Sequence, residues 1–338
     1  MKKAIALTLC VMMLLTFLAG CGGKQEESKP AGDAAAEEPI KIRLAHVVNE
    51  KDGFHIAAVK FKELVEERTN NRVQIEIFPN ATLGDERTLL EGMQMATIDM
   101  GVITNGPVAN FLPEIAVFEM PFLFSSGEEA YKILDGPIGE LLLDKLETVN
   151  LKGLAYAERG FRNLTNSKRP VHTPADVEGL KIRVMENPVY IDTFKALGAN
   201  TVPMAWTEAL TALQQGTIDG QENPVNVIHS FKLHETQKHL SMTRHTYAPA
   251  LFVMSLKKFK ELPEDVQQVF IEAAQEAAEH ERKVNAENEQ KQLEDLKNWG
   301  MEIIQPDLEP FKEAVKPVYD KYSDKFGEYL NKIQKELE

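Results

Sequence analysis

From residue 40 onward, short segments that alternate apolar and polar residues are interleaved with longer segments whose apolar residues recur every three or four positions. The first pattern is typical of strands and the second of amphipathic helices. Five such segments follow one another in the order strand, helix, strand, helix, strand: 40–45, 54–69, 73–78, 85–95 and 98–103. Crossovers of this kind favour a parallel sheet, so the pattern predicts an α/β body.

A second series of the same kind begins near residue 154. It contains predicted strands around 154–156 and at 179–184, followed by predicted helices at 189–197 and 206–215. The segment 263–299 is predicted to form one long helix, with Pro263 in its first turn and Gly300 directly after its end. Because its middle, 279–292, is almost entirely polar, we expect either an element that bridges two lobes or an ordinary solvated charge run.

The N-terminus has the pattern of a targeting segment. Lys2 and Lys3 precede an uncharged apolar run that ends in small residues just before Cys21. This ending resembles the bacterial lipobox, which implies a signal peptide at 1–20, a lipid anchor on Cys21 and a flexible tether at 21–39. The expected location is the extracytoplasmic face of the cell membrane. The alternative is a plain secretory peptide with an incidental cysteine.

Charge and cysteine content narrow the possible functions. The chain carries 38 Lys and Arg against 52 Asp and Glu, a net charge of -14, which is the wrong sign for binding nucleic acid. Only two cysteines are present, and Cys10 would be lost with the signal peptide while Cys21 would carry lipid. We therefore expect neither a disulfide nor thiol catalysis.

Common catalytic motifs are absent from the sequence. His234 and His239 resemble a zinc-peptidase pair but lie five positions apart, about 140° around a helix, so they do not share a metal easily. The nucleophile elbow, the dinucleotide fingerprint and the phosphate-binding loop do not occur. We therefore expect no metal and no cofactor, although an enzyme built from scattered residues stays possible.

Three features suggest ligand chemistry. Arg183 shares one face of the strand at 180–184 with Lys181, and its planar guanidinium is suited to bidentate carboxylate binding, although an exposed strand arginine is the plainer reading. The segment 218–224 holds many hydrogen-bonding groups before a proline, a pattern that also suits a simple turn. Trp206 offers an aromatic wall beside a helix N-terminus, or it belongs to the core.

Several ordered blocks together resemble one known family. The segments 160–166, 176–184, 197–199, 202–204 and 212–224, with 83–87, 113–114 and 119–122, are similar to the DctP-type solute receptors of tripartite ATP-independent periplasmic (TRAP) transporters. The resemblance runs from residue 40 to the C-terminus. It implies a two-lobed α/β fold that closes on a small organic acid, with the long C-terminal helix spanning both lobes. The expected lobes are 40–160 plus 249–288 and 161–248 plus 289–338.

The resemblance also implies a set of ligand-binding residues. The family's carboxylate-clamping arginine falls on Arg183, its companion on Arg162, its cleft aromatic on Trp206 and its ligand-bonding asparagine on Asn223. Three positions from the first lobe that vary with the ligand are also expected in the site, namely His46, Glu86 and Asn105.

The implied function is that of a monomeric receptor, not an enzyme, that hands its ligand to membrane subunits of a TRAP transporter. The ligand is expected to be either a C4-dicarboxylate, held by Arg183 and Arg162, or a hydroxylated sugar acid. The alternatives are a receptor for another importer or a membrane sensor, and, from a different class, a lipid-anchored hydrolase.

Overall fold

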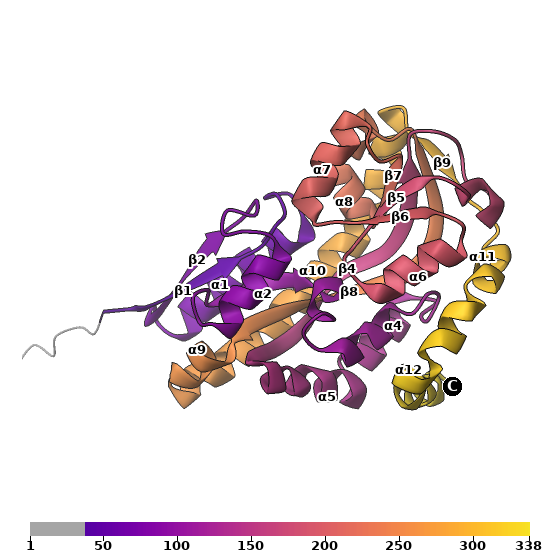
Figure 1. Ribbon diagram of the computed structural model, residues 1–338. Helices are drawn as coiled ribbons and strands as arrows, with labels where there is room; N and C mark the ends of the chain where they lie inside the picture. Colours follow the sequence, from indigo (N-terminus) through magenta and orange to yellow (C-terminus); the bar gives the residue numbers. More distant parts are fainter. Residues whose placement is uncertain (1–37) are drawn as a thin grey trace, which may run out of the picture. The chain divides into compact units, whose positions relative to one another are not determined.

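The computed structural model describes residues 38–338, and these form one unit built around a mixed sheet (Figure 1). The strands lie in the order β2-β1-β3-β8-β4-β7-β5-β6, and β9 pairs with β8. The strand bounds are β1 (Ile40–Ala45), β2 (Val73–Phe78), β3 (Met100–Thr104), β4 (Leu151–Asn166), β5 (Lys181–Val184), β6 (Asn200–Pro203), β7 (Gly220–Asn223), β8 (His239–Ser255) and β9 (Glu302–Ile304). The predicted signal peptide, Cys21 and the tether as far as residue 37 lie outside the described residues.

Two parallel groups of strands are joined by a long antiparallel pair. Strand β1 runs parallel to β2 and β3, and β5 runs parallel to β6 and β7, as the crossover pattern predicts. Between these groups, β4 and β8 pair with each other antiparallel and extend from one group to the other. The predicted α/β class is therefore confirmed.

The longest strand, β8, is missing from the sequence prediction. Fifteen of its 17 residues, from Leu240 to Thr243 and from His245 to Ser255, are buried, so the alternation that marks a half-exposed strand is absent. Its partner β4 contains a register shift between Glu158 and Gly160, and Gly160 adopts a φ of 104° that suits glycine. This irregularity lies beside the lobe boundary predicted at residue 160, which stays a prediction.

The predicted helices occur in the predicted order, and further helices that the sequence pattern does not predict, such as 127–134, 137–145 and 316–337, occur as well. Helix α7 matches its predicted range, and α1, α2 and α6 differ from theirs by one residue at each end. The α-helices are α1 (Gly53–Arg68), α2 (Glu86–Gln94), α3 (Asn105–Val108), α4 (Gly127–Leu134), α5 (Pro137–Lys145), α6 (Pro188–Ala196), α7 (Trp206–Gln215), α8 (Val225–Ser230), α9 (Leu256–Glu261), α10 (Glu264–Asn298), α11 (Glu309–Ala314) and α12 (Lys316–Leu337). The 3-10 helices are η1 (Pro113–Glu119), η2 (Leu146–Val149), η3 (Pro174–Val177) and η4 (Leu233–Glu235).

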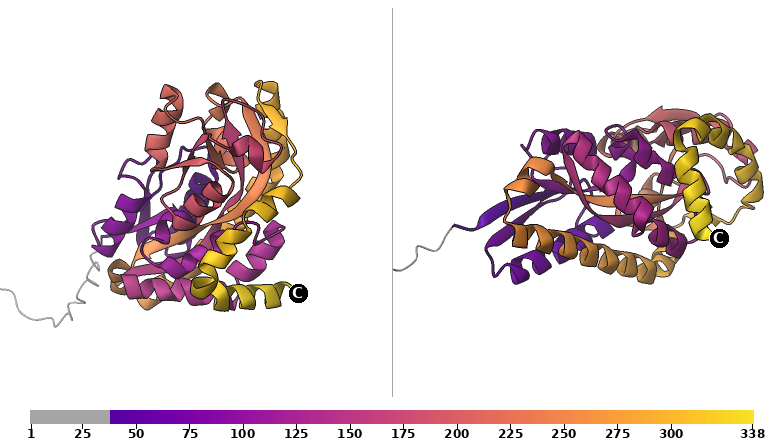
Figure 2. Two further views of the ribbon diagram at one scale, coloured as in Figure 1. Left: turned by 45° about the vertical axis from the view of Figure 1, so that its right-hand side comes forward. Right: turned by 90° about the horizontal axis from the view of Figure 1, so that it is seen from below.

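Helix α10 is the predicted long helix, and it packs against α1, β4 and α8 (Figure 2). The expectation that the polar middle of this helix, 279–292, lies in solvent is wrong in part, because Glu281 and Arg282 are buried. Glu281 accepts a hydrogen bond from the backbone N–H of Glu158 at 2.9 Å, and Arg282 donates to the carbonyl oxygen of Tyr156 at 2.7 Å. These two side chains therefore attach α10 to β4 and are not solvent-exposed.

The C-terminal helix α12 packs against η1, α4 and α5 from the first series of elements and against α6 from the second. Its buried face repeats along the helix with Val318, Tyr322, Phe326, Leu330 and Ile333. The chain thus returns at its end to hold the two series together. Within residues 38–338, no helix has the length and apolar character that crossing a membrane requires.

Candidate functional site

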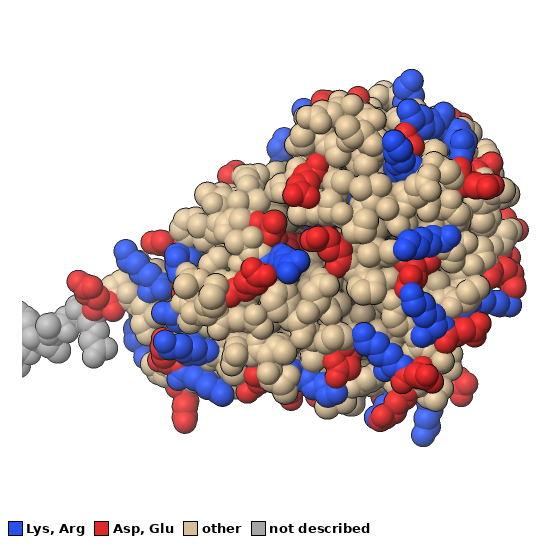
Figure 3. Space-filling model, viewed as in Figure 1, with Lys and Arg blue, Asp and Glu red and all other residues tan. Residues whose placement is uncertain are grey.

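A cleft lies between α2 and α7, at the carboxyl ends of parallel strands, which is where open α/β sheets usually bind ligands. Figure 1 labels these two helices. One wall comes from the first strand group and the other from the segments after β5 and β6. Figure 3 shows acidic side chains gathered around a hollow in this part of the surface. The cleft is lined by Val47, Asp85, Glu86, Arg87, Pro107, Asn110, Arg183, Met185, Glu186, Met204, Ala205, Trp206 and Thr207.

Arg183 is the central cation of this cleft. It comes from β5, it is 3% exposed, and among the described residues it has no carboxylate within ion-pair distance. Its Nε and Nη2 donate to the carbonyl oxygen of Met204 at 3.0 and 2.7 Å, which leaves Nη1 and one Nη2 proton without an acceptor among residues 38–338. Burial lowers the pKa of Arg183 to about 10, although Glu222 opposes that shift. A buried cation without a directly bonded counterion favours an anion at its free N–H groups.

The N-terminus of α7 adds further donors. Its N-cap, Ala205, has no side chain that caps the first turn, and Ala205, Trp206 and Thr207 all line the cleft. Free N–H groups at a helix start favour anions. The indole of Trp206 stacks near the Arg183 guanidinium at 5.6 Å, and its buried Nε1 has no hydrogen-bond partner among residues 38–338. The second wall therefore offers donors from Arg183, Trp206 and the start of α7, beside the carboxyl group of Glu186.

The opposite wall supplies acceptors. Glu86, in the first turn of α2, accepts a hydrogen bond from the backbone N–H of Thr104 at 2.7 Å, which holds its carboxyl group beside the cleft. Burial raises the pKa of Glu86, and the bond from Thr104 opposes that change. Asp85 and Glu186 line the same cleft, and Asn110 donates to the carbonyl oxygen of Glu186 at 2.7 Å, which links the walls.

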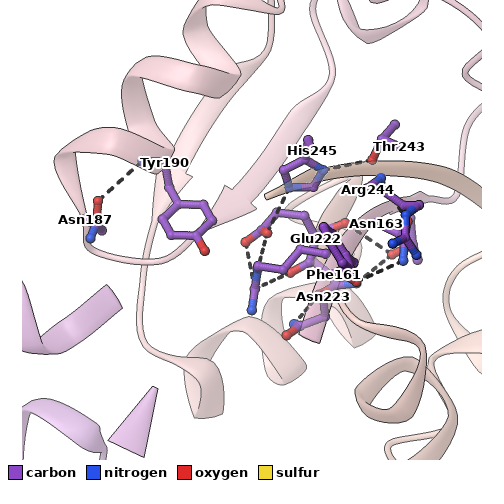
Figure 4. Close-up of polar contacts among 12 residues, drawn as sticks. Phe161, Asn163, Asn187, Tyr190, Glu222, Asn223, Thr243, Arg244 and His245 are labelled. Atoms are coloured by element: carbon purple, nitrogen blue, oxygen red, sulfur yellow. Dashed lines mark hydrogen bonds and ion pairs between the residues drawn. The ribbon is translucent and has the colours of Figure 1, made fainter. Parts of the chain in front are cut away.

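Arg162 lies nearby but already has a partner. Its guanidinium forms a bidentate pair with Glu222, and both side chains are buried. His245 contacts the same carboxylate at 3.2 Å and is held on its other side by Thr243 at 2.8 Å (Figure 4). Burial alone would lower the pKa of Arg162, but the Glu222 carboxylate outweighs it and raises that pKa. The structure thus gives the two arginines different surroundings.

The other predicted site residues lie outside the cleft lining. His46 is buried with its Nε2 3.1 Å from Nδ1 of His55, and the residue after it, Val47, lines the cleft instead. Asn105 is buried and donates to the carbonyl oxygen of Ile115 at 3.2 Å. Asn223 donates to Oε1 of Gln221 at 2.6 Å. Of the seven predicted ligand-binding residues, the structure places Arg183, Trp206 and Glu86 together.

Sequence reasoning missed several lining residues that are neighbours of predicted ones. Asp85 and Arg87 flank Glu86, and Met185 and Glu186 follow Arg183. The family block 83–87 contains Asp85 and Arg87, and Met185 and Glu186 come directly after the family block 176–184. In the described part of the chain, no group of three or more His, Cys, Asp and Glu side chains is arranged to hold a metal ion.

Comparison with known proteins agrees with this geometry. Residues 44–325 match the family model DctP, bacterial extracellular solute-binding protein, family 7. A solute-binding protein of Verminephrobacter eiseniae is 43% identical over 87% of this chain and 88% of its own. The 2,3-diketo-L-gulonate-binding periplasmic protein YiaO of Escherichia coli is 42% identical over 81% of this chain and 84% of its own.

Among solved structures, a TRAP periplasmic solute-binding protein from Polaromonas sp. JS666, bound to D-erythronate, superposes with a TM-score of 0.86. It is 41% identical and covers 87% of this chain and 98% of its own. The family match, the extent of these relatives and the buried cation in a cleft between two walls lead to one conclusion. This chain belongs to the DctP family of TRAP solute-binding proteins, bacterial extracellular solute-binding protein family 7.

Proposed function

We propose that this protein is the extracytoplasmic receptor of a TRAP transporter for a small hydroxylated monocarboxylic acid. The observation that carries the proposal is Arg183, a buried guanidinium whose Nη1 has no acceptor among the described residues. A carboxylate can accept hydrogen bonds from Nη1 and Nη2, on the side of the guanidinium that is left free. The uncapped start of α7 and the Nε1 of Trp206 add donors to the same anion or to the group next to it.

The remaining walls favour hydroxyl groups over a second carboxylate. Asp85, Glu86 and Glu186 line the cleft, and a carboxylate close to them would be repelled, whereas a hydroxyl can donate to them. The second buried arginine, Arg162, is neutralised by Glu222, so it offers no free positive charge for a dicarboxylate. The C4-dicarboxylate alternative is therefore the less favoured of the two expected ligand classes.

The ligands of similar proteins support the same choice. The relative from Escherichia coli is named for binding 2,3-diketo-L-gulonate, and the structure from Polaromonas sp. JS666 contains D-erythronate. Both ligands carry one carboxylate and several oxygen groups along a short carbon chain. The carboxylate of such an acid would bind Arg183, and its hydroxyl groups would contact the acidic side chains that line the cleft.

A ligand panel tests this function. D-erythronate and D-gluconate are compared with succinate, and with erythritol as a control that keeps the hydroxyls but lacks the carboxylate, by thermal shift and then by calorimetry. A ligand at about 100 times its Kd adds about 2.7 kcal/mol to stability, so binders are readily detected. We expect a hydroxy acid to bind at least tenfold more tightly than succinate and erythritol to have no effect. Tighter binding of succinate, or equal binding of erythritol, contradicts the proposal.

The same proposal includes a lipid anchor on Cys21, which lies outside the described residues. It is supported by the charged start, the apolar run and the small residues before Cys21. Two or more acyl chains on one cysteine suffice for stable attachment. We expect the wild-type protein in the membrane fraction and a Cys21→Ser variant in the soluble fraction, and equal distribution of the two contradicts the anchor.

A further inference from the structure

A second pocket lies among β4, β8, α4, α8 and α10, and it shares no lining residue with the cleft. Its walls are strongly polar. Because Arg183 and Trp206 are not part of it, the proposed acid receptor function leaves this pocket unexplained. The polar groups that carry the argument are Asn226, Arg244, Glu158, Glu289 and Gln292.

One part of the pocket offers hydrogen-bond donors. Arg244 lies with its guanidinium over the ring of Phe161, 3.8 Å from the ring centre, and within residues 38–338 this guanidinium has neither an ion pair nor a hydrogen bond (Figure 4). Its backbone adopts a φ of 42°, a conformation that costs a non-glycine residue about 1–2 kcal/mol. This conformation falls where β8 loses register with β4, opposite the shift between Arg162 and Leu164.

Asn226 is the second donor, and it is 8% exposed. Its Oδ1 accepts from the backbone N–H of Val227 at 2.8 Å, while its buried Nδ2 has no partner in the described part of the chain. An unsatisfied buried amide costs about 1–3 kcal/mol. A ligand that accepts from Nδ2 would remove that cost.

The pocket also offers acceptors. Glu158 is 9% exposed, and its carboxyl group is held by the hydroxyls of Tyr131 and Tyr247. Glu289 lines the pocket and forms no ion pair with another described residue. The buried Oε1 of Gln292 has no donor in residues 38–338.

We propose that this pocket binds a small zwitterion of the α-amino acid type. Its carboxylate would accept from Arg244 and Nδ2 of Asn226, and its ammonium group would donate to Glu158, Glu289 and Oε1 of Gln292. A simple anion is disfavoured by the three glutamates that line the pocket, Glu128, Glu158 and Glu289, and a simple cation leaves Arg244 without a partner. A zwitterion satisfies both groups at once.

The test screens the proteinogenic L-amino acids one at a time by thermal shift, with wild-type protein and with Arg183→Ala, in which the acid cleft is disabled. We expect at least one amino acid to raise the Tm of both proteins. Calorimetry then compares two pocket variants. Arg244→Asn removes the guanidinium but keeps a residue that tolerates a positive φ, and Asn226→Asp keeps the acceptor for Val227 but lacks the Nδ2 donor.

Each folded variant is expected to bind that amino acid at least about tenfold more weakly, a loss of one good hydrogen bond to a charged group. If Arg244→Asn fails to fold, Asn226→Asp alone decides the outcome. The proposal is overturned if no amino acid raises the Tm of wild type. It is equally overturned if the effect disappears in Arg183→Ala and persists in the pocket variants, because the amino acid then binds in the acid cleft.

Discussion

Arg183 and Arg162 show how the surroundings of one residue type decide its role. Both are buried, which by itself lowers the pKa of each, and the Glu222 carboxylate opposes that shift in both. The positive charge of Arg162 lowers the pKa of Arg183 further. The guanidinium of Arg162 is paired with Glu222, whereas within the described residues Arg183 donates only to a backbone carbonyl, that of Met204. A buried ion pair holds a structure in place, while a buried cation without a counterion attracts one.

The Arg162–Glu222 pair can be tested through stability. In Glu222→Gln the Arg162 guanidinium stays buried without a negative partner, and breaking a buried pair in this way costs about 3–5 kcal/mol. We expect the free energy of unfolding, measured in urea at neutral pH, to fall by that order.

The matched control is Glu91→Gln, which breaks the exposed pair of Arg87 and Glu91 by the same chemical change. Exposed pairs contribute little, so this variant is expected to unfold like wild type. Equal stability of Glu222→Gln and Glu91→Gln contradicts the account of the buried pair.

At the scale of elements, Asn187 connects three parts of the chain. It caps α6 by accepting from the backbone N–H of Val189 at 2.8 Å, and its Nδ2 donates to the carbonyl oxygen of Gly106 and to Oε2 of Glu119. Glu119 is fully buried at the end of η1. The start of α6 is thereby fixed to α3 and η1, just beyond the strand that carries Arg183.

The buried carboxyl group of Glu119 makes this connection sensitive to pH. Burial raises its pKa from 4.5 to about 8, so the folded protein keeps this proton up to a higher pH than the unfolded chain does. Stability from this group is present below pH 4.5 and is lost as the pH rises toward 8. The loss is on the order of a few kcal/mol.

Glu119→Gln replaces the neutral acid with a neutral amide that still accepts from Asn187. We expect its free energy of unfolding to decline less than that of wild type between pH 5 and pH 8, the window set by a pKa of about 8. Urea titrations of both proteins across this range measure the difference. Parallel pH profiles for the two proteins exclude a raised pKa at Glu119.

Elements with a clear local pattern could be predicted from the sequence, and elements defined by burial could not. The ranges of β1, β2 and α7 follow directly from their periodicity, and Pro263 and Gly300 mark the ends of α10. The strand β8 shows no alternation because both of its faces are covered. Arg183, Trp206 and Glu86 were placed by family resemblance, since periodicity alone left Arg183 open as an exposed strand residue.

The partners of these residues could not be predicted because they come from distant parts of the chain. Glu222 belongs to a segment that the sequence marks as polar, yet nothing local indicates that it neutralises Arg162. His245 lies in the unpredicted β8 and completes the same cluster. Pairings of this kind depend on the register of β4, β7 and β8, which periodicity does not determine.

The whole molecule is acidic, although its expected ligand is an anion. The net charge is -14 at pH 7, and removal of the proposed signal peptide, with Lys2 and Lys3, would make it more negative. Asp85, Glu86 and Glu186 bring part of this charge to the cleft itself. Arg183 therefore attracts an anion only at short range, because the acidic surface repels anions at longer distances.

Salt should consequently speed up binding. Screening reduces repulsion between exposed charges beyond about 8 Å at physiological ionic strength, so we expect the association rate constant of the acid to rise by about twofold or more between low and physiological salt. Stopped-flow fluorescence can follow this, because Trp206 lines the cleft. An association rate that falls with added salt indicates attraction at long range and contradicts the prediction.

The central claim is that Arg183 holds the carboxylate of the ligand, and calorimetry of Arg183→Ala tests it most directly. Arg87→Ala serves as the control, since it removes an equal charge from an exposed residue of the same cleft. With the tightest acid of the panel, we predict that Arg183→Ala binds at least about 30-fold more weakly, the equivalent of about 2 kcal/mol. Arg87→Ala should stay within about threefold of wild type. If Arg183→Ala keeps its fold by circular dichroism and binds the acid as tightly as wild type, the carboxylate is held elsewhere.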